Sequence, residues 1–409
     1  NYGHISRIAF GPFRSLLITD PDHLKEIFLN QNKNFSSKMG YKPILQDFFN
    51  NSLITQDGDD HKTQRRIFQN SFKNEAMKGY VDIINPIIRK RILAWNYVDD
   101  FHFHPNIKQL LLDIASQVFL GINDIDADKN EKLCKAFLQI SEKGIQSIIK
   151  KEIPGLAFST GLKGKRYLDS FIKELIPTRR EQVGKDLMSV MVKEVTDDGE
   201  YWPDELLISN LGLLLFAAHD TNTSALSHML LYLAKPEHRA LQEELREHAH
   251  SLNTYTPSYD DLEGMTGIEY CMMEILRIHP SVIMLPRRTV NQCKLGDYEI
   301  PANTRLFLSP YWTQFNPEFW SNPFDFDPKR FSPERAEHKN HSFSFTGFGG
   351  GAHKCIGMHF AKMQVKLFMH QFLLTYKFET PKNYNPKFQM LPLPKPADNL
   401  PLKLTPLLH

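Results

Sequence analysis

The sequence predicts a mostly α-helical protein with a small β lobe. Apolar residues recur at helical spacing through about residue 280, whereas the part that follows is rich in proline, phenylalanine and aspartate, as in short strands and loops. No low-complexity linker separates the two parts, and no internal repeat is present. The sequence therefore predicts a single domain, 1–409, with two lobes.

The composition agrees with a globular protein that can bury a sizeable core. The 409 residues are 41% hydrophobic, and 49 Lys and Arg stand against 47 Asp and Glu, a formal net charge of +2. This balance excludes the strongly basic surface typical of nucleic-acid-binding proteins, so we expect no nucleic-acid partner. Four scattered cysteines without a CxxC pair predict neither a disulfide scaffold nor a zinc site, and favour the cytoplasm.

The first 20 residues predict two strands joined by a Gly11-Pro12 turn, as if the sequence opened inside a fold. The chain starts at Asn1 and has no apolar run of about 18 residues that could span a membrane. We expect a missing lead-in segment before Asn1, which leaves membrane association through that segment open.

Helices are predicted from start and stop signals. Asp20 is a candidate N-cap before Pro21, and a core helix over 107–120 ends at Gly121. The longest helix should run over 203–235, because a proline suits its first turn and another ends it.

One cysteine, Cys355, follows a glycine-rich turn at the expected start of a last helix, which should end at about residue 372. A helix N-terminus favours a thiolate, so Cys355 is suited to be an anionic metal ligand. Gly349 permits a sharp turn and Gly357 leaves room for a flat group. An isolated cysteine is more often a small buried residue than a metal ligand. The spacing of the residues around Cys355 distinguishes the two.

The spacing Phe-x-x-Gly-x-x-x-Cys-x-Gly over 348–357 resembles the haem-ligand motif of cytochromes P450. The resemblance implies the cytochrome P450 fold and haem b (iron protoporphyrin IX), with Cys355 as the thiolate ligand of the iron and Phe348, Gly349 and Gly357 around the haem. A cysteine ligand favours O–O cleavage over simple electron transfer. The resemblance thus implies a haem-thiolate monooxygenase.

An acid and a base, Glu274 and Arg277, lie one turn apart on a predicted helix. Such a pair alone is common on surface helices. The stretch resembles the family's Glu-x-x-Arg motif, however, and 328–331 resembles its Pro-x-Arg-Phe motif. The resemblance implies that Glu274, Arg277 and Arg330 form a buried structural cluster that holds the loop of Cys355.

Asp220 and Thr221 lie beside the most apolar stretch of the longest helix. In isolation, Thr221 could bond to a carbonyl one turn earlier while Asp220 faces water or a partner. The segment resembles the family's oxygen-binding motif, which implies that the pair passes protons to the oxygen being activated. Ala218 replaces the family's glycine and Asn222 its second hydroxyl residue, and both departures bear on turnover rate and coupling rather than on the reaction class.

The resemblance also implies cations for the haem carboxylates, at His61, Arg65, Arg287 and His353. Arg288 competes with Arg287, because the sequence does not show which of two neighbours on a strand points inward.

The resemblance places the substrate pocket along five apolar and aromatic segments, namely a loop at 39–49 and the stretches 153–158, 216–217, 282–285 and 390–393. The candidate pocket residues are Phe216, Ala217, Val282, Ile283, Met284 and Leu391. They suit a lipophilic substrate, such as a fatty acid, terpenoid, retinoid or sterol, and they also suit an ordinary core. His219, the three glycines after Phe348 and the stretch 394–400 resemble the branch of retinoic-acid hydroxylases and sterol demethylases.

The resemblance implies dioxygen as a cosubstrate and an external electron donor, because the chain has no flavin or iron–sulfur motif. A ferredoxin, a flavodoxin or an NADPH-dependent reductase would serve. Lys354, Lys362 and Lys366 suit either a basic docking patch for an acidic donor or a solvated helix face. The alternatives to a monooxygenase are a peroxygenase or non-oxidative isomerase on the same scaffold, and a haem-binding sensor without turnover. The acid–alcohol pair argues against all of these.

Overall fold

The computed structural model describes residues 4–10, 13–30, 33–95, 100–122, 127–182, 184–196 and 199–407. The expected Gly11-Pro12 turn lies outside these residues. The chain divides into two compact units: the first comprises Asn1–Ser36, Ile84–Leu111 and Asp220–His409, and the second comprises Ser37–Ile83 and Leu112–His219. That they form a single domain stays a prediction.

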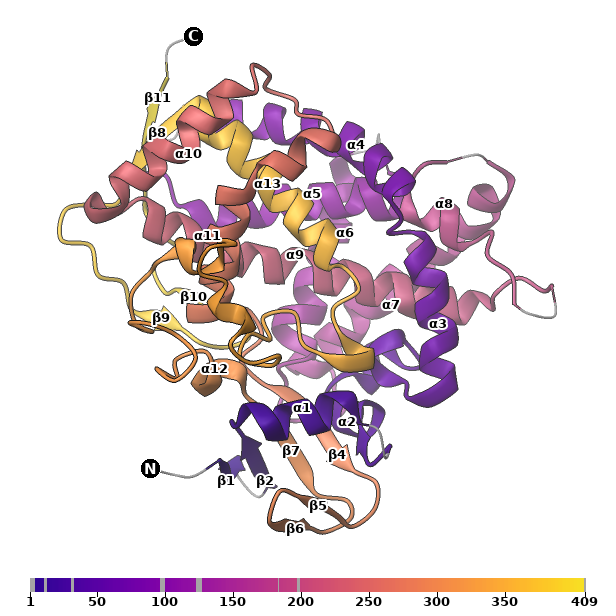
Figure 1. Cartoon of the computed structure of the whole chain (residues 1–409). Helices are drawn as coiled ribbons and strands as arrows, with labels where there is room; N and C mark the ends of the chain where they lie inside the picture. The colour runs from indigo at the N-terminus through magenta and orange to yellow at the C-terminus, as the bar shows by residue number, and fades with distance from the viewer. Residues whose placement is uncertain are drawn as a thin grey trace. The chain divides into compact units, whose positions relative to one another are not determined.

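The first unit holds all of the sheets of the described residues and several helices. Its strands are β1 (Ile5–Phe10), β2 (Phe13–Ile18), β3 (Phe35–Ser36), β4 (Leu285–Thr289), β5 (Cys293–Leu295), β6 (Tyr298–Ile300), β7 (Arg305–Leu308), β8 (Tyr376–Glu379), β9 (Phe388–Gln389), β10 (Lys395–Pro396) and β11 (Lys403–Pro406). Its helices are α1 (Pro21–Leu29), α10 (Arg239–Ser251), α11 (Thr266–Ile278), α12 (Pro310–Thr313) and α13 (Met358–Thr375). Figure 1 shows the chain coloured from its N-terminus to its C-terminus.

The second unit is helical in its described residues. It contains α2 (Ser37–Phe49), α3 (Gly58–Asn70), α6 (Ala127–Leu138), α7 (Ala157–Glu181) and α8 (Leu187–Met191). Three helices have residues in both units, namely α4 (Asn74–Ala94), α5 (Phe103–Leu120) and α9 (Asp204–Leu233). Among the described residues, no helix is long and apolar enough to cross a membrane.

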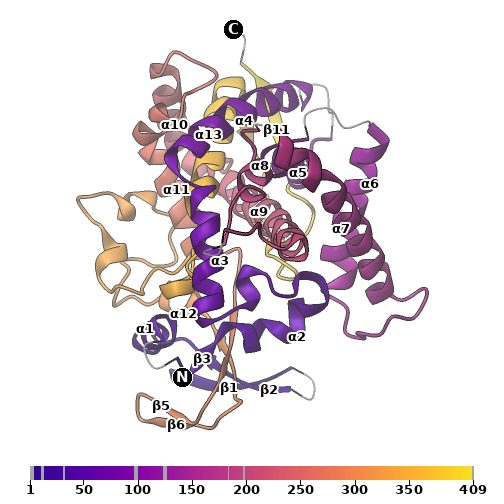
Figure 2. The ribbon, with the colours of Figure 1, turned by 90° about the vertical axis from the view of Figure 1, so that its right-hand side faces the viewer.

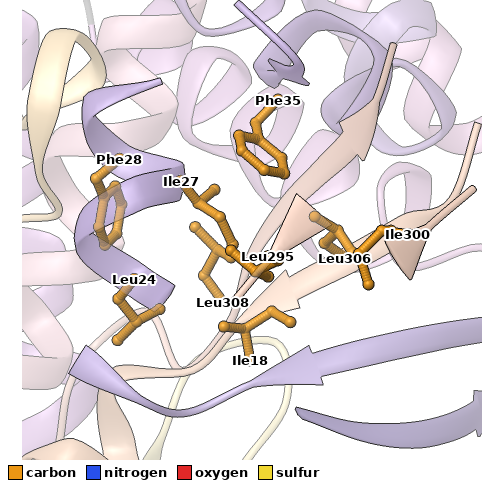
Figure 3. Packing of buried hydrophobic residues seen from close by; sticks show 9 residues of the cluster. All are labelled: Ile18, Leu24, Ile27, Phe28, Phe35, Leu295, Ile300, Leu306 and Leu308. Carbon is orange, nitrogen blue, oxygen red and sulfur yellow. The ribbon is translucent and has the colours of Figure 1, made fainter. Parts of the chain in front are cut away.

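The main sheet has the strand order β1-β2-β7-β4-β3, with β2 and β7 parallel and the other pairs antiparallel. One face packs against α1, and the two lie side by side in Figures 1 and 2. In Figure 3, Ile18 and Leu308 from the strands lie close to Leu24 and Ile27 of α1. The sheet and α1 thus form one apolar core, which anchors the N-terminal strands.

Most of the helix boundaries agree with the sequence predictions. The side chain of Asp20 caps α1 by accepting from the N–H groups of Asp22 and His23, both at 3.0 Å. Gly121 ends α5 with a φ of 65°, in the left-handed region that favours glycine. With 30 residues, α9 is the longest helix of the described residues and lies within the predicted range.

Two local predictions are wrong. Residues 39–49 belong to α2 rather than to a loop, because burial of Leu45, Phe48 and Phe49 at helical spacing outweighs the helix-breaking effect of Pro43. The last helix does not begin at Cys355, since α13 starts three residues later, at Met358. The cause is the backbone N–H of Cys355, which donates to a carbonyl of the preceding loop.

Candidate functional site

Cys355 lies in a short loop before α13. Its N–H donates to the carbonyl of Phe348 at 2.9 Å, which closes the loop, and its side chain is exposed. Gly349 adopts a φ of 70°. Gly357, two residues beyond the cysteine, has no atom within 4 Å of the position a Cβ would occupy. The loop therefore presents a thiol next to backbone that carries no side chain, a donor and a surface that fit a flat group with a thiolate-binding metal.

A second glycine of this loop packs closely on α1. Gly351 has a φ of 62°, and a Cβ there would come within 1.8 Å of the carbonyl oxygen of Phe28. Only glycine fits both the backbone conformation and the approach. The loop of Cys355 is thus held against the sheet-and-helix core.

Glu274, Arg277 and Arg330 form the buried cluster that the sequence predicts. Arg277 binds Glu274 through Nε at 2.7 Å and through Nη2 at 2.9 Å, and Arg330 Nε binds the same carboxylate at 3.0 Å. All three side chains are at most 1% exposed. Removal of the carboxylate would leave the buried guanidinium of Arg277 without its counter-ion, at a cost of about 3–5 kcal/mol.

The remaining guanidinium N–H groups of the cluster bind backbone carbonyls. Arg277 donates to the carbonyls of Gln314 and Pro323, both at 2.7 Å, and to that of Asp325 at 3.2 Å. Arg330 Nη1 donates to the carbonyl of Ser321 at 2.6 Å. The cluster therefore holds the irregular segment between α12 and the Cys355 loop through its main chain.

Gln314, which sequence reasoning missed, connects the cluster to the cysteine loop. Its buried amide nitrogen donates to the carbonyls of Leu276 and Arg277 at 3.2 and 2.9 Å, and its oxygen accepts from the N–H of Thr346 at 3.3 Å. Thr346 in turn accepts from the N–H of Gly349 at 2.8 Å. The sequence carries no signal for Gln314, because these contacts join segments far apart along the chain.

Glu337 is a further acid of the cluster that the sequence did not indicate. It accepts from Arg330 Nη1 at 2.8 Å and from Ser321 Oγ at 2.7 Å. Burial alone would raise the pKa of Glu337, but hydrogen bonds from Ser321, Arg335 and Arg330 outweigh burial and lower the pKa to about 2. Glu337 thus stays ionised, and its negative charge offsets the positive charge of Arg330.

Asp220 faces a cation rather than water. Lys108 Nζ of α5 lies 3.3 Å from Asp220 Oδ1, and the two side chains are 20% and 17% exposed. Thr221 is half-buried, and its carbonyl accepts from Ser281 Oγ at 2.9 Å. The acid and the alcohol are thus neighbours on α9 in the first unit, and Lys108 is a partner of Asp220 that the sequence did not predict.

The side chain of Asn222 contacts α13. Its buried amide nitrogen donates to Gln364 Oε1 at 2.6 Å, which joins α9 to α13. His219, the preceding unusual residue of the motif, is buried in the second unit, with its Nδ1 at 3.1 Å from the carbonyl oxygen of Leu215.

The candidate cations divide between the units. In the first, Arg287 is 5% exposed, His353 is half-buried, and Arg288 donates from Nε to the carbonyl of Asn303 at 3.1 Å. In the second, buried His61 and half-buried Arg65 lie one turn apart on α3.

The candidate pocket residues also divide. Phe216 and Ala217 belong to the second unit, where the ring of Phe216 lies 5.3 Å from that of Phe49. The first unit contributes the other four, of which Val282 is 41% and Leu391 69% exposed, while Ile283 and Met284 are half-buried. Val282 and Leu391 are exposed and so are not ordinary core residues.

The predicted lysine patch is largely neutralised. Lys362 and Lys366 lie 2.7 and 2.6 Å from the two oxygens of Glu269, and Lys366 is only 8% exposed. Burial would raise the pKa of Glu269, but these two lysines lower it. Buried Lys366 therefore belongs neither to a docking patch nor to a solvated helix face. Of the three lysines, Lys354 is the exposed one.

Comparison with known proteins gives consistent matches. The family described as Cytochrome P450 matches residues 1–403. Putative cytochrome P450 136 of Mycobacterium tuberculosis is 32% identical over 390 residues, which cover 94% of this chain and 78% of that protein. Taxane 10-beta-hydroxylase of Taxus cuspidata is 27% identical over 418 residues, which cover 99% of this chain and 80% of that protein.

Among solved structures, a retinoic acid bound cyanobacterial CYP120A1 has the same fold as this chain. The TM-score is 0.87 at 23% identity, over 99% of this chain and 92% of that one. The predictions of a mostly helical fold with small sheets and of this family are both confirmed.

Proposed function

Since the chain belongs to the cytochrome P450 family and is a monooxygenase of that family, we propose that it hydroxylates a lipophilic small molecule at a haem bound by Cys355. The family implies a haem-thiolate cofactor, dioxygen, an external redox partner and a small-molecule substrate. The observation that carries the proposal is the closed loop of Cys355, which the buried Glu274 cluster holds through Gln314.

Cys355 supplies the thiolate ligand in this proposal. The exposed side chain, the loop closed by Phe348 and the open space at Gly357 all suit a flat cofactor. When bound, haem supplies a centre at which dioxygen is reduced and one oxygen atom passes to the substrate. The loop keeps the sulfur in one position, because the N–H of Cys355 donates to the carbonyl of Phe348.

Asp220 and Thr221 deliver protons. The carboxylate of Asp220, whose Oδ1 lies 3.3 Å from Lys108 Nζ, accepts a proton from solvent, and the hydroxyl of Thr221 passes a proton onward. Ser281 fixes the backbone of Thr221 by donating to its carbonyl. Lys108 therefore acts as a positioning residue for the acid.

Arg287, His353, His61 and Arg65 bind the haem carboxylates. Arg287 is preferred to Arg288 because its guanidinium is buried, whereas Arg288 is half-buried and donates to the carbonyl of Asn303. A buried guanidinium suits the bidentate recognition of a carboxylate.

The substrate belongs to the terpenoid or retinoid class. Val282 and Leu391 present exposed apolar surface in the first unit, and Phe216 adds an aromatic ring in the second. A taxane hydroxylase among the relatives, and the retinoic acid bound structure with this fold, support the choice. The electron donor is a ferredoxin, a flavodoxin or an NADPH-dependent reductase.

The carbon monoxide difference spectrum of the reduced protein tests this function. A thiolate-ligated haem gives its characteristic band in the wild type and in Cys293→Ser, the matched control, and the band is lost in Cys355→Ser. Absence of the band from the wild type would overturn the proposal. A screen of terpenoids, retinoids, fatty acids and sterols by the Soret spin-state shift then identifies the substrate class, and product formation with a reductase separates turnover from mere binding.

A further inference from the structure

A groove of 740 Å³ in the first unit is lined by four arginines, Arg7, Arg14, Arg288 and Arg305. They come from the strands β1, β2, β4 and β7. Arg7 and Arg14 are exposed, and Arg288 and Arg305 are half-buried. Among the described lining residues there is no aspartate or glutamate. The groove is therefore rich in arginine, in a chain whose formal net charge is only +2.

The strand register brings two of these cations together. Arg288 and Arg305 are directly opposite each other in the antiparallel pair of β4 and β7. Like charges at opposed positions destabilise a sheet. Leu306, the next residue on β7, lies on the face that packs against α1 (Figure 3), so the arginine pair lies on the other face of the sheet. Two guanidinium groups on one face suit an anionic ligand.

Ser15 of β2 supplies an independent observation. It lines the same groove and is 4% exposed, yet its Oγ has no hydrogen-bond partner among the described residues. A buried hydroxyl without a partner is unfavourable and rare. Ser15 and Arg305 each lie one position before the paired residues Leu16 and Leu306, so they share a face of the sheet.

We propose that this groove binds a phosphate group, carried by a soluble phosphate compound or by the headgroup of an anionic lipid. Guanidinium groups match the oxygens of phosphate in bidentate hydrogen bonds, and the hydroxyl of Ser15 adds one neutral donor. The site is separate from the proposed monooxygenase reaction, because none of the residues placed in that reaction lines it.

Titration calorimetry of the haem-containing protein with inorganic phosphate and with pyrophosphate, at constant ionic strength, measures the site directly. We expect Arg288→Gln/Arg305→Gln, which removes the opposed pair on the face of Ser15, to bind pyrophosphate about tenfold more weakly than the wild type, and Ser15→Ala to bind it severalfold more weakly. Arg239→Gln, an exposed arginine outside the groove, is the matched control and should bind like the wild type. The carbon monoxide spectrum should be the same in all four proteins.

Flotation with vesicles distinguishes the sources of phosphate. Binding to phosphatidylcholine vesicles that contain phosphatidate, and not to phosphatidylcholine alone, supports the site and indicates a lipid headgroup. Binding of pyrophosphate without binding to phosphatidate vesicles supports the site and indicates a soluble compound. No binding of any of these probes by the wild type, or equal binding by the wild type and the double variant, overturns the proposal.

Discussion

The side chain of Asn222 donates a hydrogen bond of 2.6 Å to Gln364 and so joins the helix of the acid–alcohol pair to the helix that follows Cys355. Both residues are buried, at 4% and 2% exposure. We expect Asn222→Ala to lower the free energy of unfolding by about 1–3 kcal/mol, because it leaves the amide of Gln364 buried without this partner. Urea unfolding measures the loss.

The double variant Asn222→Ala/Gln364→Leu is the control for this prediction. Removing both polar partners should recover part of the stability. If the double variant loses as much stability as Asn222→Ala and Gln364→Leu together, the two side chains are not coupled.

Lys108 should control the function of Asp220. The variant Lys108→Met removes the cation 3.3 Å from the carboxylate, so we expect turnover to fall about tenfold and more reducing equivalents to be consumed without product. The Soret shift on substrate binding should not change. Lys403→Met, which removes an exposed ion pair to Glu379, is the control. Unchanged coupling in Lys108→Met would exclude the positioning role.

Glu274 and Gln314 should differ in how strongly they affect haem content. Glu274→Ala leaves buried Arg277 without its counter-ion and removes one of the two acids that bind Arg330, so we expect no haem-loaded protein. Gln314→Ala loses only neutral hydrogen bonds, so we expect haem to bind but the thiolate spectrum to be lost at a lower temperature. The ratio of haem to protein absorbance checks both, and normal haem content in Glu274→Ala would contradict the role of the cluster.

Gly351 should not tolerate a methyl group. Gly351→Ala combines a positive φ with a Cβ only 1.8 Å from the carbonyl of Phe28, so the loop of Cys355 must move. We expect a stability loss of more than about 2 kcal/mol and a weaker carbon monoxide band. Gly264→Ala, whose Cβ meets no atom within 4 Å, is the matched control. Equal stability of the two variants would show that the loop adapts.

Acid should destabilise the protein through buried histidines. Burial lowers the pKa of His228 to about 4, and burial, aided by Lys395 and Lys108, lowers that of His104 to about 3. The unfolded chain therefore binds more protons between these values and about 6.5, so stability is complete above that range and falls as the pH falls through it. We expect His228→Gln to reduce the slope of unfolding free energy between pH 7 and pH 5, by roughly 1 kcal/mol per pH unit.

The matched control for this slope is His248→Gln, at an exposed position on α10. It should retain the slope of the wild type. An identical slope in His228→Gln would show that other groups cause the acid sensitivity.

The main elements could be predicted from the sequence because their signals are local. Asp20 caps the helix that begins at the next residue, and the motif around Cys355 lies within ten residues. Gln314 and Lys108 could not be predicted, because their partners lie on other elements and neither residue stands in a recognisable pattern. The prediction of a loop at 39–49 was wrong because it came from the resemblance alone, whereas this chain buries Leu45, Phe48 and Phe49 at helical spacing.

Arg277 and Arg330 bind the main chain of residues 321–325 rather than its side chains. They donate to the carbonyls of Ser321, Asn322, Pro323 and Asp325. A carbonyl is present whatever the residue. The side chains of residues 321–325 can therefore vary between related proteins while the support of the cysteine loop is kept. The sequence of this segment can diversify, whereas Arg277 and Arg330 cannot.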